Sequence, residues 1–180
     1  LGRLSKAIGL VIEASLEPGR NAMTITLSGE NQMPYALDVR FRTRKPESDE
    51  ACPLRLSTEL TERKVAAGET VALRATLENT SDEGQPMTVA LLGLPAGLEP
   101  RTDQLDELKK EGTIAYYETR PRQVICYWRS LAPKKKVDVK LDLVAAVPGR
   151  YTGPASRAYL YYTAEEKQWA DPLEVEIARQ

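Results

Sequence analysis

Residues 136–143 have the sequence Lys-Val-Asp-Val-Lys-Leu-Asp-Leu, in which charged and apolar residues alternate without a break. Successive side chains of a β-strand point to opposite faces of the sheet, so this pattern predicts a strand with one buried and one solvated face. Sheets that are wet on one side are typical of antiparallel proteins. The stretch therefore predicts an antiparallel β fold.

The same alternation recurs along the chain. It covers residues 37–42, 54–60, 71–77 and 173–177, and further strand candidates cover residues 23–28, 87–92, 114–119, 124–129 and 158–162. Runs rich in glycine, proline, asparagine and aspartate separate these segments and predict turns. About eight strands within roughly 125 residues are typical of a β-sandwich. We therefore expect an antiparallel β-sandwich.

One segment, residues 101–112, has a helical pattern instead. Leu105 and Leu108 lie three positions apart, acidic residues come mostly early, and Lys109 and Lys110 come late. This order of charges suits the dipole of a helix, and it predicts that the two lysines are solvated partners of the helix C-terminus. Because so short a helix is unstable alone, we expect both leucines to pack against the sheet.

The ends of this helix are also marked in the sequence. Thr102 or Asp103 can accept a hydrogen bond from the first free backbone N–H groups, so either residue can be the N-cap. Gly112 suits the left-handed conformation that often follows the last turn of a helix. We therefore predict one short helix within an otherwise β domain.

Residues 124–128, Val-Ile-Cys-Tyr-Trp, are apolar on both alternating sets, unlike the other predicted strands. One set belongs in the core of the sandwich. The other set, which contains Ile125 and Tyr127, needs a cover, and we expect the helix or a neighbouring domain to supply it. The alternative is an edge or interface strand with an aromatic residue at the surface.

Composition excludes several classes of function. The chain has no histidine, so neither a Ser-His-Asp or Cys-His catalytic arrangement nor a histidine-containing zinc site can form. Lys and Arg number 25 against 26 Asp and Glu, and this balance gives no basic field for nucleic acid or anionic lipid. The apolar residues 10–12 are far too few for a signal segment or a membrane span. Composition therefore favours a soluble, folded protein that is not an enzyme and needs no metal or cofactor.

The two cysteines, Cys52 and Cys126, have no metal-like spacing. One disulfide between them is open as an interpretation, although two free thiols are favoured. Cys126 lies in an apolar predicted strand, where a buried thiol behaves as a small hydrophobic group. Neither cysteine defines the redox compartment.

A domain boundary is predicted in the polar, proline-containing stretch around residues 44–50. We divide the chain into a partial β segment at 1–44, a linker at 45–53 and a complete sandwich at 54–180. The first segment holds too few strands to bury a core by itself. Because the chain also begins without methionine, we interpret it as part of something longer.

Several motifs together resemble a known family. They are Gly-Leu-Pro-Ala-Gly-Leu-Glu-Pro at 93–100 before the lone helix, Tyr-Tyr-Glu at 116–118, the strand at 124–128, Pro-Gly-Arg-Tyr-Thr-Gly-Pro at 148–154, and Ala-Tyr-Leu-Tyr-Tyr at 158–162. From about residue 54 to 177 the chain resembles the C-terminal receptor-binding macroglobulin domain of the alpha-2-macroglobulin family. That likeness implies a fibronectin-like macroglobulin sandwich.

Two further features extend the resemblance. Residues 18–28 and 34–37 are similar to the strands of the CUB domain that rejoin after the thioester domain in this family. The stretch around Tyr151 looks closer to the bacterial members than to the vertebrate ones. The resemblance therefore implies the tail of a CUB domain followed by a bacterial-type macroglobulin domain.

The family consists of large protease traps that capture nucleophiles with a thioester, and this chain departs from their active parts. The thioester signature is Gly-Cys-Gly-Glu-Gln, whereas Cys52 precedes proline and Cys126 precedes tyrosine. The lysines that dock vertebrate members to a receptor are replaced here by Glu99 and Asp103. The resemblance therefore implies neither a thioester nor that receptor contact within this chain.

The resemblance then implies a non-catalytic C-terminal segment of an alpha-2-macroglobulin-like protease inhibitor. The segment would pack against the thioester domain, shield it, and rearrange when a protease is trapped. Its partners would be the upstream thioester and macroglobulin domains of the same parent chain and, indirectly, a protease, with no nucleic acid and no membrane insertion. The location would be secreted or in the cell envelope, and periplasmic in a bacterium.

The sequence also suggests which residues touch a partner. These candidates are Ile125, Tyr127, Tyr161, Tyr162, Lys109 and Lys110. An alternative hypothesis is a fibronectin-like or carbohydrate-binding surface adhesion module, in which the tyrosine cluster and Trp128 form a sugar-binding platform. Packing within the sandwich or against a sister domain is the favoured role for that cluster.

Overall fold

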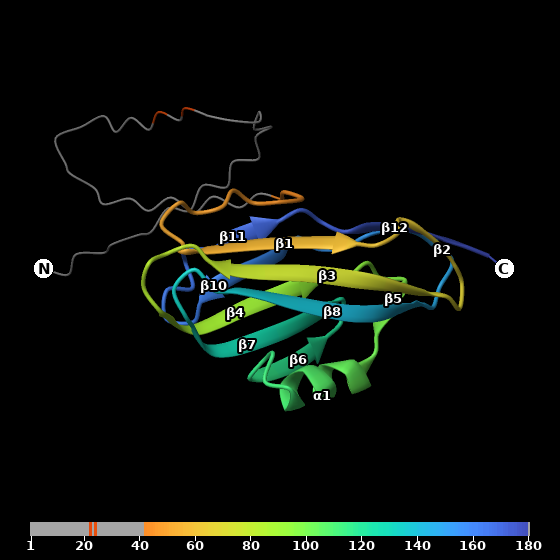
Figure 1. Ribbon diagram of the computed structural model, residues 1–180. Coiled ribbons are helices and arrows are strands. Elements are labelled where there is room, and N and C mark those ends of the chain that lie inside the picture. The colour runs from red at the N-terminus through yellow and green to blue at the C-terminus, as the bar shows by residue number, and fades with distance from the viewer. Residues whose placement is uncertain (1–21, 23, 25–41, 180) are drawn as a thin grey trace, which may run out of the picture. The chain divides into compact units, whose positions relative to one another are not determined.

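The alternating stretch at residues 136–143 lies in strand β8 (Lys136–Ala145), in the interior of one sheet of a β-sandwich. The computed structural model describes residues 22, 24 and 42–179 (Figure 1). Nearly all of the predicted strands at 23–28 and 37–42, and of the predicted partial domain at 1–44, lies outside the described residues.

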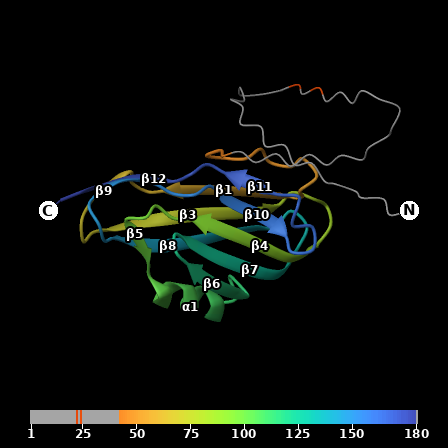
Figure 2. The same ribbon diagram turned by 180° about the vertical axis from the view of Figure 1, so that it is seen from behind.

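Two antiparallel sheets face each other, as the two opposite views show (Figures 1 and 2). The first has the order β1 (Leu54–Leu60), β3 (Thr70–Asn79), β8 and β5 (Leu98–Pro100). The second has the order β11 (Gln168–Ala170), β10 (Ser156–Leu160), β4 (Gln85–Gly93), β7 (Gln123–Leu131) and β6 (Tyr116–Arg120). The predicted antiparallel sandwich with one short helix is confirmed.

A third, smaller sheet has the order β2 (Lys64–Ala66), β12 (Glu174–Ala178) and β9 (Gly149–Thr152). Its β2–β12 pair is parallel, an exception to the antiparallel pairing elsewhere in the described residues. None of the short strands β2, β5, β9 and β11 was predicted. The strand predicted at 158–162 is wrong at its C-terminal end, because β10 ends at Leu160 and both Tyr161 and Tyr162 lie in the following turn.

Alternation creates the core as the sequence predicts. Leu73 in β3 pairs with Leu141 in β8, and both side chains are fully buried between the sheets. Burial of one such side chain stabilises the fold by about 1.5–3 kcal/mol. The alternate positions face solvent, where Thr76 donates a hydrogen bond of 2.6 Å from its hydroxyl to the Asp138 carboxylate.

Helix α1 (Thr102–Lys110) is anchored to β8 by one side chain. The Gln104 amide nitrogen donates to the Asp142 carboxylate at 2.8 Å, and the Asp142 backbone N–H donates to the Gln104 amide oxygen at 2.7 Å. Leu105 is fully buried in the main core, as expected, and Leu108 packs partly against it. The helix thus lies against β8 and β6 at one edge of the sandwich (Figure 2), and does not cover the outer face of β7.

The two ends of α1 differ in how well they were predicted. Gly112 follows the helix with a φ of 78°, which confirms it as the stop. The predicted cap by Thr102 or Asp103 is wrong, because Arg101 occupies the N-cap position and no side chain caps it. The Asp103 carboxylate instead accepts a 2.6 Å bond from the Arg101 guanidinium.

Candidate partner-binding face

Two rows of side chains cross the outer face of the five-stranded sheet. The first row follows the strand register from Tyr159 to Val89, Tyr127 and Tyr116. The second row contains Trp169, Arg157, Leu91, Ile125 and Glu118. We call the apolar and aromatic members of these rows, Val89, Leu91, Tyr116, Ile125, Tyr127, Tyr159 and Trp169, the aromatic face.

The aromatic face has its own small apolar cluster, separate from the main core. Val89, Leu91 and Ile125 are buried on it, and the rings of Tyr127 and Tyr159 pack against them. The second apolar set of residues 124–128 is therefore covered partly by neighbouring tyrosines and not by the helix. Tyr116 remains about half exposed at the edge of the face, at 53%.

A hydrogen-bond network fixes Tyr127. Its hydroxyl donates to one Glu118 carboxylate oxygen at 2.7 Å, and the Arg120 guanidinium donates to the other at 3.0 Å. Burial, followed by the bond to Glu118, raises the pKa of Tyr127 to about 12. The hydrogen bonds from Tyr127, which is the larger cause, and from Arg120 lower the pKa of Glu118. Tyr127 is therefore a pre-positioned, protonated phenol at neutral pH.

Every cation–π pair among the described residues lies on or beside the aromatic face. The Lys109 ammonium lies 5.4 Å from the centre of the Tyr116 ring. The Arg157 guanidinium lies 5.3 Å from the Trp169 ring centre, and the Lys167 ammonium lies 5.7 Å from that of Tyr159. Each contact places a positive charge over an aromatic ring, an arrangement stabilised by the ring quadrupole.

The structure brings only some of the sequence-predicted residues together. Ile125 and Tyr127 lie on the aromatic face, and Lys109 joins it through Tyr116. Lys110 is exposed at the end of α1. Tyr161 and Tyr162 form an edge-to-face pair with ring centres 5.4 Å apart, in the turn after β10.

Sequence reasoning missed the contributions of Trp169 and Arg157. Trp169 lies in β11, which is too short to show a periodic pattern, and Arg157 is recognisable only once β10 is paired with β4 and β11. Tyr116 and Tyr159 belonged to the tyrosine cluster noted in the sequence, but their placement in one row across the sheet depends on the strand register.

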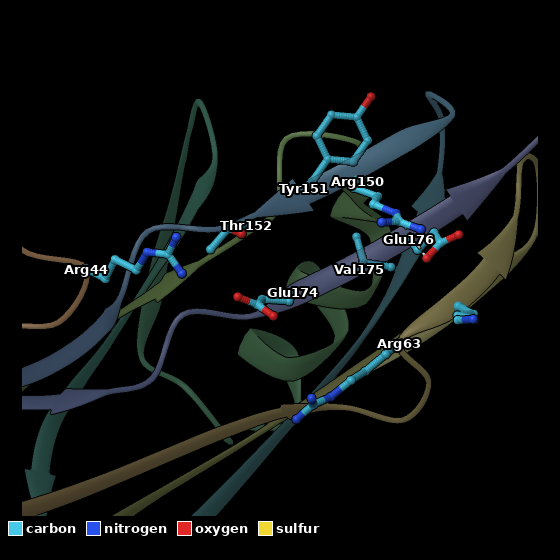
Figure 3. A pocket seen from close by; sticks show the side chains of 9 residues that line it. Arg44, Arg63, Arg150, Tyr151, Thr152, Glu174, Val175 and Glu176 are labelled. Atoms are coloured by element: carbon cyan, nitrogen blue, oxygen red, sulfur yellow. Dashed lines mark ion pairs between the residues drawn. The ribbon is translucent and has the colours of Figure 1, made fainter.

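A second surface feature is a shallow depression of about 460 Å³ on the three-stranded sheet (Figure 3). Its charged lining consists of Arg44, Arg63, Lys64, Arg150, Glu174 and Glu176. Arg150 and Glu176 form an ion pair of 3.3 Å, although Arg150 is largely exposed. Such mixed, exposed charges are typical of a solvated sheet face.

The described residues offer little for catalysis or metal binding. They contain no group of three or more acidic or cysteine side chains placed to hold a metal ion. Both cysteines are free and buried, and burial raises the pKa of Cys126 to about 12. In the described part of the chain, no helix is long and apolar enough to cross a membrane.

The fold is a β-sandwich of the macroglobulin-like class, with a small apolar and aromatic cluster on the outer face of its five-stranded sheet. A family model described as the bacterial alpha-2-macroglobulin MG10 domain matches residues 41–165. The chain therefore belongs to the family of bacterial alpha-2-macroglobulin MG10 domains, and the predicted resemblance to bacterial alpha-2-macroglobulins is confirmed. No curated protein matches the chain.

Solved structures with the same fold include three of alpha-2-macroglobulins from two bacteria. The Salmonella protein reacted with methylamine gives a TM-score of 0.59 and 17% identity over 74% of this chain. The Escherichia coli protein activated by trypsin gives a TM-score of 0.59 and 14% identity over 73% of this chain. The native Escherichia coli protein from domain MG7 to the C-terminus gives a TM-score of 0.57 and 14% identity over 74% of this chain. The matched region spans 10%, 11% and 25% of those chains, respectively.

Proposed function

We propose that this chain is a non-catalytic segment of a larger, protease-trapping alpha-2-macroglobulin, located in the periplasm or elsewhere in the cell envelope. Within that parent it would be the C-terminal, receptor-binding type of macroglobulin domain at residues 54–180, joined by the linker at 45–53 to the tail of a CUB domain. The family match and the small share of each related chain that is covered support a segment of a larger alpha-2-macroglobulin.

The aromatic face is the surface that would pack against the thioester domain of the parent. The single observation that carries this proposal is the apolar cluster of Val89, Leu91 and Ile125 on an outer sheet face, capped by tyrosines. Aromatic residues are enriched at the centres of protein interfaces, where they contribute most of the binding energy. An aromatic cover that excludes water would slow hydrolysis of a thioester beneath it.

The exposed pair Tyr161 and Tyr162 is a second candidate contact in the same assembly. Tyr162 is 75% exposed and Tyr161 is 54% exposed, so a partner could bury both rings. Their turn follows Leu160, the last residue of β10 and the neighbour of Tyr159, which places the pair at the end of the aromatic face. Lys109 and Lys110 at the end of α1 would contact the partner's rim.

The test uses the full-length parent protein. Tyr127→Arg and Tyr162→Arg should each accelerate thioester hydrolysis and methylamine uptake, measured by release of the thioester cysteine. Arg74→Glu, an exposed substitution on the opposite sheet, is the matched control and should leave the lifetime unchanged. If both tyrosine variants retain the wild-type lifetime while still folded, this face does not shield the thioester.

The alternative function is an adhesion module that binds carbohydrate on the same tyrosines. The exposed ring of Tyr116 favours it, but the ring is tilted by 46° from Tyr127 and does not extend a flat platform. Titration of the chain with neutral oligosaccharides, monitored by tryptophan and tyrosine fluorescence, separates the two functions. Saturable binding that Tyr116→Ala abolishes would support the adhesion module.

A further inference from the structure

The two outer faces of the sandwich differ in chemistry. The strands of the four-stranded sheet contain no aromatic residue, and their charges nearly balance. Those charges are Arg55, Arg74, Lys136 and Lys140 against Glu59, Glu78, Glu99, Asp138 and Asp142. Ion pairs link some of them, such as Lys136 and Glu78 at 3.5 Å. This face is that of an ordinary solvated sheet.

The five-stranded sheet is different because its strands carry a surplus of positive charge. Their charged residues are Arg120, Arg129, Arg157 and Glu118. The carboxylate of Glu118 is already engaged by Tyr127 and Arg120. Two further cations, Lys109 and Lys167, lean over the rings of the aromatic face. The Asp106 carboxylate lies beside Lys109 and accepts a hydrogen bond from the Tyr117 hydroxyl. The surplus is local, since the whole chain has a net charge of −1.

The cations and the rings form one composite surface. Arg157 and Lys167 are partly buried, so their charges are less hydrated than those of freely exposed side chains. Their placement over Trp169 and Tyr159 limits the rotamers that binding would have to fix. A pre-positioned cation beside an apolar centre attracts carboxylates while the centre excludes water.

We propose that the aromatic face binds an acidic protein surface, namely a face of another domain of the parent with an apolar centre and a carboxylate rim. This inference rests on the proposed function and adds the charge of the partner. The partner's apolar side chains cover Ile125 and Tyr127. Its carboxylates pair with Lys109 at one side and with Arg157 and Lys167 at the other.

Electrostatic docking has a measurable signature. Exposed ion pairs are screened when the Debye length falls from about 10 Å at 0.1 M salt to about 3 Å at 1 M. Three such pairs together are worth roughly a tenfold change in the docking equilibrium. A purely apolar contact would not weaken with sodium chloride in this way.

Hydroxyl-radical footprinting of the full-length native protein measures the docking directly. The rings of Tyr116, Tyr127 and Trp169 report exposure of the aromatic face. In the wild type these rings should be protected relative to the isolated chain, and about 1 M sodium chloride should reduce the protection. In the triple variant Lys109→Glu, Arg157→Glu, Lys167→Glu the docking equilibrium should shift by roughly tenfold toward the undocked state, so the rings should lose protection.

Two controls make the outcome decisive. The variant Lys109→Arg, Arg157→Lys, Lys167→Arg keeps every charge and should keep protection, whereas Lys136→Glu with Lys140→Glu tests charge reversal on the opposite sheet. If Tyr127→Arg exposes the rings but the charge-reversed triple variant and salt do not, the face still docks and the acidic partner is wrong. If the wild-type rings are not protected at all, both the docking and the proposed function are wrong.

Discussion

A Cβ atom placed on Gly97 would lie 2.4 Å from Cε2 of Tyr151, closer than any real side chain tolerates. The two residues come from the two most distinctive sequence motifs, at 93–100 and 148–154. The same motifs meet again where a Cβ on Gly93 would lie 1.9 Å from the Pro154 carbonyl oxygen. The motifs that resembled a family in the sequence therefore hold one end of the sandwich together.

The first prediction follows from this contact. Gly97→Ala should lower the free energy of unfolding by about 1–3 kcal/mol, because the ring of Tyr151 must move to admit the methyl group. Gly84→Ala is the matched control, since its nearest neighbour would be 3.7 Å away. Urea denaturation of both variants measures the difference. Tyr151→Leu should make Gly97→Ala less costly, and equal costs in both backgrounds would contradict the proposed clash.

Much of the fold was predictable because the long strands are half buried. The alternation at 54–60 and 136–143 matches β1 and most of β8, since each strand has one core and one solvent face. Strands of three or four residues, such as β2 and β11, are too short to show a period. The strand predicted at 158–162 extended too far, because Tyr161 and Tyr162 are compatible with a strand as well as with the turn in which they lie.

The candidate site was only half predictable for a different reason. The doubly apolar pattern of residues 124–128 correctly indicated that Ile125 and Tyr127 occupy a second face. What joins them depends on non-local pairing, which sets Val89 beside Tyr127 and Tyr159 beside Val89. The strand register therefore brings the charged and aromatic residues together on one sheet, and the register cannot be read from any local sequence pattern.

The second prediction concerns Asn79, which is fully buried at the end of β3. Its amide nitrogen donates to the carbonyls of Glu83 at 2.7 Å and Ala132 at 2.9 Å, and its amide oxygen accepts the Ser81 backbone N–H at 3.0 Å. Asn79→Asp should lower the free energy of unfolding by about 2–4 kcal/mol, because carbonyls lose their donor and a carboxylate is buried.

Denaturant titration checks this result beside Glu83→Gln, which keeps the accepting backbone carbonyl. The Glu83 side chain is exposed, so this control should change stability by less than about 0.5 kcal/mol. A loss as small in Asn79→Asp as in the control would show that the turn does not depend on the amide.

The third prediction concerns the thiols. Cys126 is fully buried in β7 and its pKa is raised to about 12 by burial, and burial also raises the pKa of Cys52. Because the thiolate is the reactive form, both should resist a disulfide reagent in the native chain near pH 8 and react together on unfolding. If no thiol reacts with the reagent after unfolding without reductant, the two cysteines are joined in a disulfide and the structure is contradicted.

The last prediction concerns the pH dependence of Tyr127. Its pKa is raised to about 12 in the folded state from an ordinary value of about 10, with burial as the larger cause and Glu118 as the smaller. A raised pKa means that the protonated phenol stabilises the fold fully below pH 10, and that this contribution is lost as the pH rises through 12. Phenolate absorbance should therefore show a late step whose amplitude Tyr127→Phe reduces. Tyr117 also contributes to this step, because its hydrogen bond to Asp106 raises its pKa. Glu118→Gln should move the step to lower pH while leaving it above the ordinary value, because the burial remains. A step that Glu118→Gln returns fully to the ordinary value would show that the carboxylate, and not the packing of the aromatic face, controls this tyrosine.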